Sequence, residues 1–423
     1  MKALLRWFDA RMPTIGAEWR KHAAAYYVPK NLNLWYEFGS LAGLVLIIQI
    51  VSGIFLTMNY KPDADLAFGS VEYIMREVPG GWLIRYIHST GASAFFIVVY
   101  LHMFRALLYG SHKRPRELVW IFGALIYLTL MGEAFFGYLL PWGQMSYWGA
   151  QVIVNLFGTI PFIGPDLALW IRGDYVVSDA TLNRFFALHV IALPLVLLAL
   201  VVVHILALHD VGSSNPEGVD IKKLKDANGH PLDGIPFHPY YTVKDIVIAV
   251  VFLAIFCFIM FFVPEVGGYF LEANNFIPAD PLKTPPHIAP VWYFTPYYSI
   301  LRAVPPLFNS QFPGVLAMGT AVLILFFLPW LDRSPVKSIR YRGALYKRWL
   351  AAFALVFLTL GYLGTESTTV WGQFGFNAFF LDTKDIATWV ARLCTIVYFL
   401  FFFLMPWYTA RDRVKPVPAR VTV

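Results

Sequence analysis

Residues Trp82 to Arg105 read WLIRYIHSTGASAFFIVVYLHMFR, a stretch that is long and apolar enough to cross a bilayer as one helix. It carries two histidines, His88 and His102, which are fourteen residues apart. At a rise of about 1.5 Å per residue they lie about 21 Å apart along a helix, on nearly the same face. Polar side chains inside a membrane are expensive, and they are therefore functional candidates. The stretch predicts a membrane helix that offers one imidazole near each surface of the bilayer.

The composition is that of a membrane protein with many spans. Of the 423 residues, 58% are hydrophobic and 14% are charged, whereas soluble proteins average about 25% charged residues. The two cysteines, Cys257 and Cys394, lie in apolar runs, which excludes a disulfide framework and a Cys-x-x-Cys-His haem attachment. We predict an all-α membrane protein with eight transmembrane helices, at 34–58, 83–107, 117–139, 185–208, 243–263, 313–331, 346–364 and 386–407.

The basic residues predict the orientation of these helices. The net charge is +7, but the lysines and arginines flank apolar spans, so they do not indicate nucleic-acid binding. With the N-terminus inside, most of the 33 Lys and Arg residues fall on internal segments. We expect both termini in the cytoplasm and an N-terminal segment that is retained, because it lacks the pattern of a signal peptide. The long external connections, 59–82, 140–184, 264–312 and 365–385, are expected to fold back and shape a pocket.

The fourth span repeats the histidine pattern of the second. His189 and His204 are fifteen residues apart, and both spans run from outside to inside. His88 then pairs with His189 near the outer surface, and His102 pairs with His204 near the inner surface. One histidine in an apolar helix is usually a satisfied core residue, but two matched pairs favour two haems, each with two axial histidines. The extra residue adds rotation, which a kink at Pro194 is expected to absorb.

Glycines and arginines support this interpretation. Gly39 and Gly53 in the first span, and Gly123 and Gly137 in the third, are also fourteen residues apart. Glycine in a membrane helix often means only close helix packing, but the shared interval favours room for a flat macrocycle. Arg85 and Arg105 lie three residues outside the two histidines of the second span, where each can pair with haem propionates.

Four further motifs make the chain resemble cytochrome b, the haem-bearing subunit of the cytochrome bc1 complex. They are GYLLPWGQMS at 137–146, GSSNP at 212–216, PFHPYY at 236–241 and Pro-x-Trp-Tyr at 290–293. The resemblance covers all eight spans and is to the undivided bacterial type. It implies that the first four helices form a haem-binding four-helix bundle. We accordingly divide the chain into a di-haem half at 1–210, a cytoplasmic linker at 211–242 and a C-terminal half at 243–423 that contributes to the outer quinol site.

The resemblance also implies roles for individual residues. His88 and His189 would hold a low-potential haem b, and His102 and His204 a high-potential haem b, both without covalent attachment. The outer quinol-oxidation site would use Tyr138, Gly149, Pro290, Trp292, Tyr293 and Tyr298. The inner quinone-reduction site would use His209, Ser213, Lys244 and Asp245. His209 lies just past the membrane face, where a histidine suits proton exchange.

One residue departs from the family pattern. The outer loop usually has Pro-Glu-Trp-Tyr, and here Val291 replaces the glutamate that is assigned to proton transfer. Because valine cannot accept a proton, another group or water must do so. Glu272 in the same loop is our hypothesis and Glu265 is second, although both also fit solvated loop acids.

The implied function is bifurcated quinol oxidation in a bacterial inner membrane. Quinol is oxidised outside, one electron crosses the two haems, and quinone is reduced inside, which contributes to the proton-motive force. The implied partners are a Rieske iron–sulfur protein and cytochrome c1, in a complex that forms a homodimer; the chain is active as an enzyme only with them. Two alternatives remain: a di-haem membrane anchor of a quinone-linked dehydrogenase, with fewer spans and no large external aromatic loops, and a transporter with histidine proton relays, which needs inverted repeats.

Overall fold

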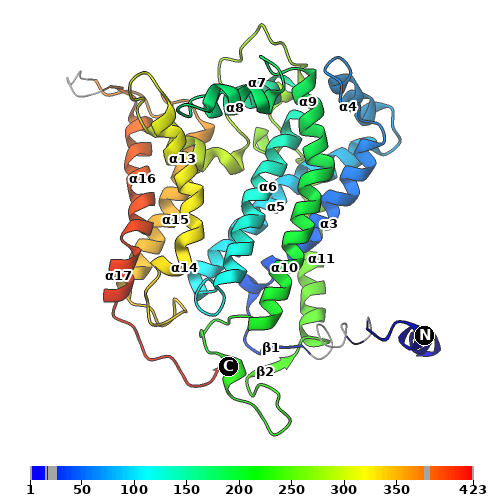
Figure 1. Cartoon of the computed structure of the whole chain (residues 1–423), viewed down its shortest axis with the longest axis vertical. Helices are drawn as coiled ribbons and strands as arrows, with labels where there is room; N and C mark the ends of the chain where they lie inside the picture. Colours follow the sequence, from blue (N-terminus) through cyan, green and yellow to red (C-terminus); the bar gives the residue numbers. More distant parts are fainter. Residues whose placement is uncertain (1, 15–16, 18–25, 376–381, 422–423) are drawn as a thin grey trace.

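Long apolar helices run side by side through the computed structural model (Figure 1), which describes residues 2–14, 17, 26–375 and 382–421. Eight helical segments within this part are long and apolar enough to cross a membrane. They are Leu34–Thr57, which contains α3 (Phe38–Thr57); α5 (Gly81–Tyr109); α6 (Glu117–Leu139); Asp179–Val211, which joins α9 (Asp179–Ala187) and α10 (Leu193–Val211); α11 (Tyr240–Phe262); Phe312–Leu331, which joins α13 (Phe312–Leu323) and α14 (Leu328–Leu331); α15 (Ala344–Thr365); and α16 (Ile386–Phe403).

The predicted all-α membrane fold with eight spans is confirmed, and most boundaries agree within a few residues. The last span differs, because α16 ends at Phe403 and a separate helix, α17 (Met405–Arg411), follows. Pro406 explains the break, since a proline lacks the N–H that would continue the helix and crowds the residue before it.

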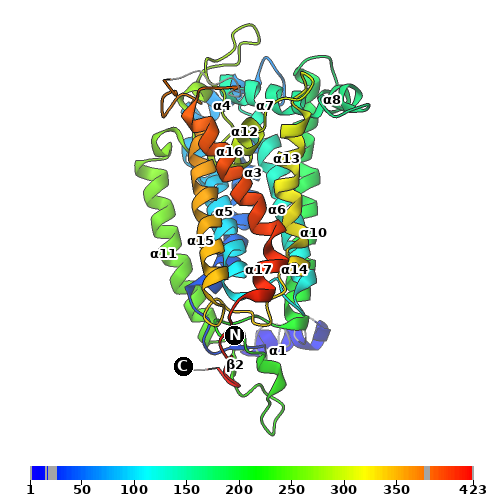
Figure 2. The ribbon, with the colours of Figure 1, turned by 90° about the vertical axis from the view of Figure 1, so that its left-hand side faces the viewer.

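The spans form two groups that share one core. In the first group, α3 packs on α5, α6 packs on α10, and α11 lies against α5. In the second, α15 and α16 pack on each other and on α12 (Thr295–Ala303). Figures 1 and 2 show the second group beside the first along the length of the bundle. The Trp120 indole of α6 donates to the Leu325 carbonyl at 2.7 Å, which ties the two groups together at a buried point.

Short elements cover the two ends of the bundle. At one end lie α4 (Ala67–Arg76), α7 (Gln144–Phe157) and α8 (Gly164–Arg172), and at the other lies a two-stranded antiparallel sheet of β1 (Tyr27–Pro29) and β2 (Gly234–Pro236), with Val28 opposite Ile235. Both chain ends lie toward the sheet end (Figure 1). The remaining short helices are α1 (Lys2–Arg11) and the 3-10 turns at 34–36, 221–223, 266–268, 273–276, 292–294 and 324–327.

Two of the connections that the sequence predicts to be external are joined through their backbones. The Gln144 N–H donates to the Ile277 carbonyl at 2.9 Å, and the Ala279 N–H donates to the Trp142 carbonyl at 3.0 Å. These bonds connect residues more than 130 positions apart, so the loops at 140–184 and 264–312 lie against each other. We call the end of the bundle that they cover the outer end. They bring residues 270–276 against the outer end of α6.

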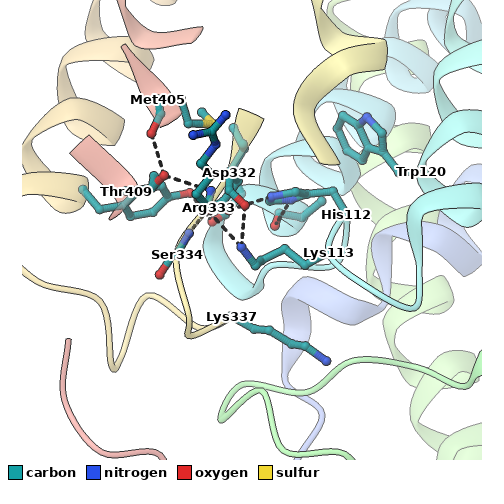
Figure 3. Close-up of polar contacts among 12 residues, drawn as sticks. His112, Lys113, Trp120, Asp332, Arg333, Ser334, Lys337, Met405 and Thr409 are labelled. Atoms are coloured by element: carbon teal, nitrogen blue, oxygen red, sulfur yellow. Dashed lines mark hydrogen bonds and ion pairs between the residues drawn. The ribbon is translucent and has the colours of Figure 1, made fainter. Parts of the chain in front are cut away.

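A cluster of charged side chains is buried at the opposite end of the bundle (Figure 3). The Asp332 carboxylate lies 2.8 Å from His112 Nε2, 3.1 Å from Lys113 Nζ and 2.5 Å from a guanidinium nitrogen of Arg342. The side chains of Asp332, His112 and Arg342 are completely buried. Burial by itself raises the pKa of Asp332, but the surrounding cations outweigh it and hold the pKa well below its usual value. The cluster fastens the turn after α5 to the connection between α14 and α15.

Candidate functional site

The four predicted histidines meet in two pairs. His88 of α5 and His189 lie with ring centroids 6.1 Å apart, and His102 of α5 and His204 of α10 lie 6.3 Å apart. Metal–nitrogen bonds of about 2 Å separate the centroids of two imidazoles that share one ion by about 6 Å. Each pair therefore has the spacing of two imidazoles that could hold one iron between them.

A π-helical turn explains the fifteen-residue interval between His189 and His204. Residues Leu188–Ala192 form this turn between α9 and α10, and His189 lies within it. A π turn accommodates one extra residue without breaking the helix, and such turns are frequent at functional sites. The sequence predicted that a kink at Pro194 accommodates the extra residue. In the structure the π turn accommodates it, and Pro194 follows at the start of α10.

Each of the four predicted glycines faces one of the histidine rings. A methyl group added at Gly137 would lie 2.3 Å from His189 Cε1, and one at Gly39 would lie 3.0 Å from His102 Cε1. The corresponding distances are 3.4 Å from Gly53 to His88 and 3.3 Å from Gly123 to His204. The glycines thus let the neighbouring helix approach the ligand ring itself, whereas the sequence suggested room for a macrocycle.

The outer histidine pair opens into a cavity of about 310 Å³. His88 and His189 line it together with Gly53, Gly137 and Arg85, and most of its other lining side chains are apolar. The cavity also reaches Tyr138, Val291 and Tyr293 of the predicted quinol site. No group of three His, Cys, Asp or Glu side chains suited to a bare metal ion occurs in the described part of the chain. Paired imidazoles beside an apolar cavity instead fit haem, whose macrocycle supplies the other four ligands.

The second nitrogen of each outer histidine has an acceptor. His88 Nδ1 lies 2.9 Å from Ser52 Oγ, whose proton is donated to the Ile48 carbonyl. His189 Nδ1 lies 2.9 Å from the Glu133 backbone carbonyl and 3.0 Å from the Glu133 carboxylate. In the inner pair, the Nδ1 atoms of His102 and His204 have no side-chain acceptor among the described residues. Sequence reasoning missed both Ser52 and Glu133, although an acid in an apolar span was a visible signal.

The two predicted propionate arginines differ in their surroundings. Arg85 lines the outer cavity and lies over the Phe276 ring, 5.4 Å from its centroid. Arg105 lies over Tyr36 at 4.9 Å and donates to Ser111 Oγ at 3.0 Å. The buried Nε of Arg105 has no acceptor among the described residues, so it is available to an anionic group.

Glu272 meets Tyr138 at the outer end of α6. The Tyr138 hydroxyl donates to the Glu272 carboxylate at 3.0 Å. Burial raises the pKa of Glu272 to about 7, because it disfavours the charged carboxylate. Hydrogen bonds from the backbone of Glu272 and from the Tyr138 hydroxyl offset only part of this effect. Glu265, the second candidate, is exposed to solvent. Of the two acids, only Glu272 therefore combines shelter from water with contact to a residue that lines the cavity.

The other predicted outer residues are spread around this point. Tyr293 lines the cavity and stacks on Phe96 of α5, with ring centroids 3.9 Å apart. Trp292 turns toward α5, where its indole donates to Ser93 Oγ at 3.1 Å. The Tyr298 hydroxyl donates back to its own loop, to the Ile288 carbonyl at 3.3 Å. Neither Pro290, Trp292 nor Tyr298 lines the cavity, and Gly149 approaches Tyr138 from α7.

The four predicted inner-site residues all contact the N-terminal segment 26–37 or its close neighbours. His209 stacks on Tyr26, with ring centroids 4.3 Å apart. Lys244 donates to the Leu32 carbonyl at 2.8 Å and lies 3.8 Å from the Glu37 carboxylate. Asp245 also lies beside Glu37.

Ser213 completes this set through its backbone. Its carbonyl accepts from Arg116 at 3.0 Å, and its neighbour Ser214 lies 3.3 Å from the Tyr36 hydroxyl. Sequence reasoning missed Glu37, which is only 3% exposed. An acid at the start of the first apolar span was the available signal.

Comparisons with known proteins agree with this geometry. A family model described as cytochrome b/b6/petB matches residues 23–212, and one described as cytochrome b(C-terminal)/b6/petD matches residues 278–399. The cytochrome b of Allochromatium vinosum is 59% identical, over 99% of this chain and 98% of its own, and that of Rhodospirillum rubrum is 47% identical, over 99% and 96%. A chain of a solved hyperthermophilic respiratory complex III superimposes with a TM-score of 0.85 at 40% identity, covering 96% of this chain and 99% of that one. This chain belongs to the cytochrome b family.

Proposed function

We propose that this protein, as the cytochrome b of a bc1-type respiratory complex, carries electrons between two haem b groups from an outer quinol site to an inner quinone site. The observation that carries the proposal is the continuous outer cavity, in which a histidine pair and the residues of the external loops line the same space. A second histidine pair follows about 21 Å away along α5. The arrangement connects a place where quinol is oxidised to a path across the membrane.

The chain's own residues hold and orient the reacting groups. Haem, when bound, would supply reversible one-electron chemistry. His88 and His189 offer the outer ligand nitrogens, and His102 and His204 offer the inner ones, while the facing glycines keep the helices close. Arg85 and Arg105 are suited to bind the propionates.

Glu272 is proposed as the proton acceptor of the outer site. With Val291 in the position of the usual glutamate, Glu272 is the sheltered acid of the outer loops that contacts the cavity lining, through its hydrogen bond to Tyr138. A pKa of about 7 lets it take a proton from quinol and release it to the outer water. Pro290, Trp292, Tyr293 and Tyr298 shape the loop that encloses the substrate.

His209, Ser213, Lys244 and Asp245 are proposed to form the inner quinone-reduction site. They come from the end of α10, the turn that follows it and the start of α11, and they lie around residues 26–37. Lysine, histidine and carboxyl groups together are suited to deliver protons to a reduced quinone. Glu37 adds a second carboxyl group to this set.

The proposed reaction requires partner proteins, because quinol oxidation passes one electron to an acceptor outside this chain. Cys257 and Cys394 lie in different helices, α11 and α16, and the described residues contain no group of three His, Cys, Asp or Glu side chains that could hold a metal ion. We therefore propose a Rieske iron–sulfur protein and cytochrome c1 as partners, in a homodimeric complex with enzyme activity. We place it in the inner membrane of a bacterium with both termini cytoplasmic, divided into a di-haem half at 1–210, a linker at 211–242 and a C-terminal half at 243–423. The di-haem anchor of a dehydrogenase is not favoured, because it would have fewer spans and no large external loops. The transporter is not favoured, because the histidines pair with each other.

A reduced-minus-oxidised spectrum of the purified complex tests the proposal. The expected result is two haem b per chain, with the outer one lost in His88→Ala and the inner one lost in His204→Ala. An oxidant added while the inner site is inhibited should reduce haem b, since one electron of each quinol then has no other acceptor. A colourless protein, or haem reduction that needs no quinol, would refute the function.

A further inference from the structure

Glu133 is an acid in the middle of an apolar membrane helix. It lies in α6, where its carboxylate is 3.0 Å from His189 Nδ1 and lines the outer cavity. Its second oxygen, Oε2, is buried and has no hydrogen-bond partner among the described residues. An acid inside a membrane is costly, so one that meets a ligand histidine is a candidate for a functional role.

The position of Glu133 corresponds to different residues around the other histidines. Each of the four glycines facing a histidine has a residue four positions earlier, one helical turn away. For the outer pair these residues are Gln49 and Glu133, and for the inner pair they are Trp35 and Val119. Of these four side chains, only that of Glu133 carries an acidic group to the ligand ring. The carboxylate is therefore a feature of the outer site and not of the repeated helix pattern.

We propose that Glu133 is a positioning residue for His189 and that it lowers the reduction potential of the outer haem. The carboxylate accepts the Nδ1–H of His189 together with its own backbone carbonyl, which lies at 2.9 Å. This fixes the tautomer and turns Nε2 toward the cavity, as carboxylates do for metal-bound histidines elsewhere. A stronger acceptor on Nδ1 makes the imidazole a better donor, and a better donor favours the oxidised iron.

The consequence is a direction for electron flow. Ser52 adds a weaker acceptor to His88, so both outer ligands have side-chain acceptors, whereas the inner ligands have none among the described residues. Both acceptors would act to place the potential of an outer haem below that of an inner one, which would favour electron transfer from the outer to the inner haem. The inference rests on the proposed haem binding by His88 and His189.

The test is a redox titration of both haems in membranes holding the whole complex, with visible spectra and haem content as readouts. Glu133→Gln keeps an acceptor oxygen but removes the charge, and it should raise the midpoint potential of the outer haem while leaving the inner one unchanged. Glu133→Ala removes both and should raise it further. Thr129→Ala is the control: Thr129 lies one turn earlier on α6 and donates only to the Leu125 carbonyl, so both potentials should stay at the wild-type values.

The outcomes separate this inference from the proposed function. Wild-type protein without an outer haem would overturn the function itself. An outer haem that is present in Glu133→Gln at the wild-type potential would overturn only the role of Glu133. Should Glu133→Gln lose the outer haem, Glu133→Asp, with a carboxylate of shorter reach, is titrated in its place. If the outer haem of Glu133→Asp has a midpoint potential above that of the wild type, the inference is supported. If its potential equals that of the wild type, or if Glu133→Asp also loses only the outer haem, Glu133 has a structural role and the inference is overturned.

Discussion

The two ends of the molecule shelter acidic side chains in opposite ways. At the inner end, Asp332 is buried among His112, Lys113 and Arg342, and the pKa of Asp332 is held well below its usual value despite its burial. At the outer end, Glu272 has the Tyr138 hydroxyl as its side-chain partner, and burial raises its pKa to about 7. The same kind of group thus remains charged at one end and can change its protonation state near neutral pH at the other.

The difference teaches how a membrane protein separates structure from chemistry. A carboxylate that is surrounded by cations cannot take up a proton near neutral pH, and it serves to hold two segments together. A carboxylate with only a weak neutral donor changes its protonation state within the working range of pH, as a general base must. Asp332 therefore has cationic partners in Lys113 and Arg342, whereas the side-chain hydrogen-bond partner of Glu272 is the neutral hydroxyl of Tyr138.

The largest expected effect comes from breaking the inner cluster. Asp332→Asn leaves the charges of Lys113 and Arg342 without their counter-charge, and removing one member of a buried pair costs about 3–5 kcal/mol of unfolding free energy. Thermal unfolding of the purified complex measures it. The control is Asp382→Asn, because Asp382 pairs with Arg392 near the surface and its loss should cost less than about 1 kcal/mol. Equal losses in the two variants would contradict the contrast between the ends.

Removing the outer acid should affect the rate and not the stability. Glu272→Gln cannot accept a proton, so quinol oxidation should fall by about 10²-fold, the lower end for general acid–base catalysis. The wild-type rate should rise as the pH increases through about 7, since the carboxylate becomes available only when ionised. The variant should lose this rise. Steady-state rates of quinol oxidation measured from about pH 5.5 to about pH 8.5 test both expectations. Glu265→Gln, at an exposed position, is the control and should keep both rate and profile.

A third prediction compares two glycines of the outer site, Gly137 and Gly53, with Gly43 as a control. Gly137→Ala brings a methyl group to 2.3 Å from His189 Cε1, so the helices or the ring must shift, at a cost of about 1–3 kcal/mol. Lower retention of the outer haem in spectra should follow. Gly53→Ala reaches only 3.4 Å from His88 Cε1, and Gly43→Ala meets nothing within 4 Å. Retention should increase in this order, and a reversed order would contradict the packing argument.

The smallest expected effect is the acid sensitivity of the inner cluster. Because the pKa of Asp332 is lower in the folded protein than the value of about 3.9 in an unfolded chain, its stabilisation is complete above that value. It is lost as the pH falls toward the folded-state pKa, at no more than about 1.4 kcal/mol per pH unit. Unfolding measured from about pH 5 downward should show this slope in the wild type. Asp332→Asn should lack this contribution.

The sequence by itself determined the spans, the two pairs of histidines and the family. Hydropathy identified eight helices because a bilayer requires long apolar runs, and helical periodicity placed His88 and His102 on one face at two depths. The motifs at 137–146 and 290–293 carried the resemblance that the comparisons confirm. These features are local, so each can be read from a short window of residues.

Tertiary structure decided which side chains work together. His112 meets Asp332 across 220 positions, and Tyr138 meets Glu272 across 134, so neither contact leaves a trace in local periodicity. The π turn at Leu188–Ala192 depends on how His189 must face His88, which the fifteen-residue interval signalled but did not resolve. Glu133 was visible as an acid, but its partner was not. The physical reason is that pairing and pKa depend on distances between distant segments, and those distances exist only once the helices have packed.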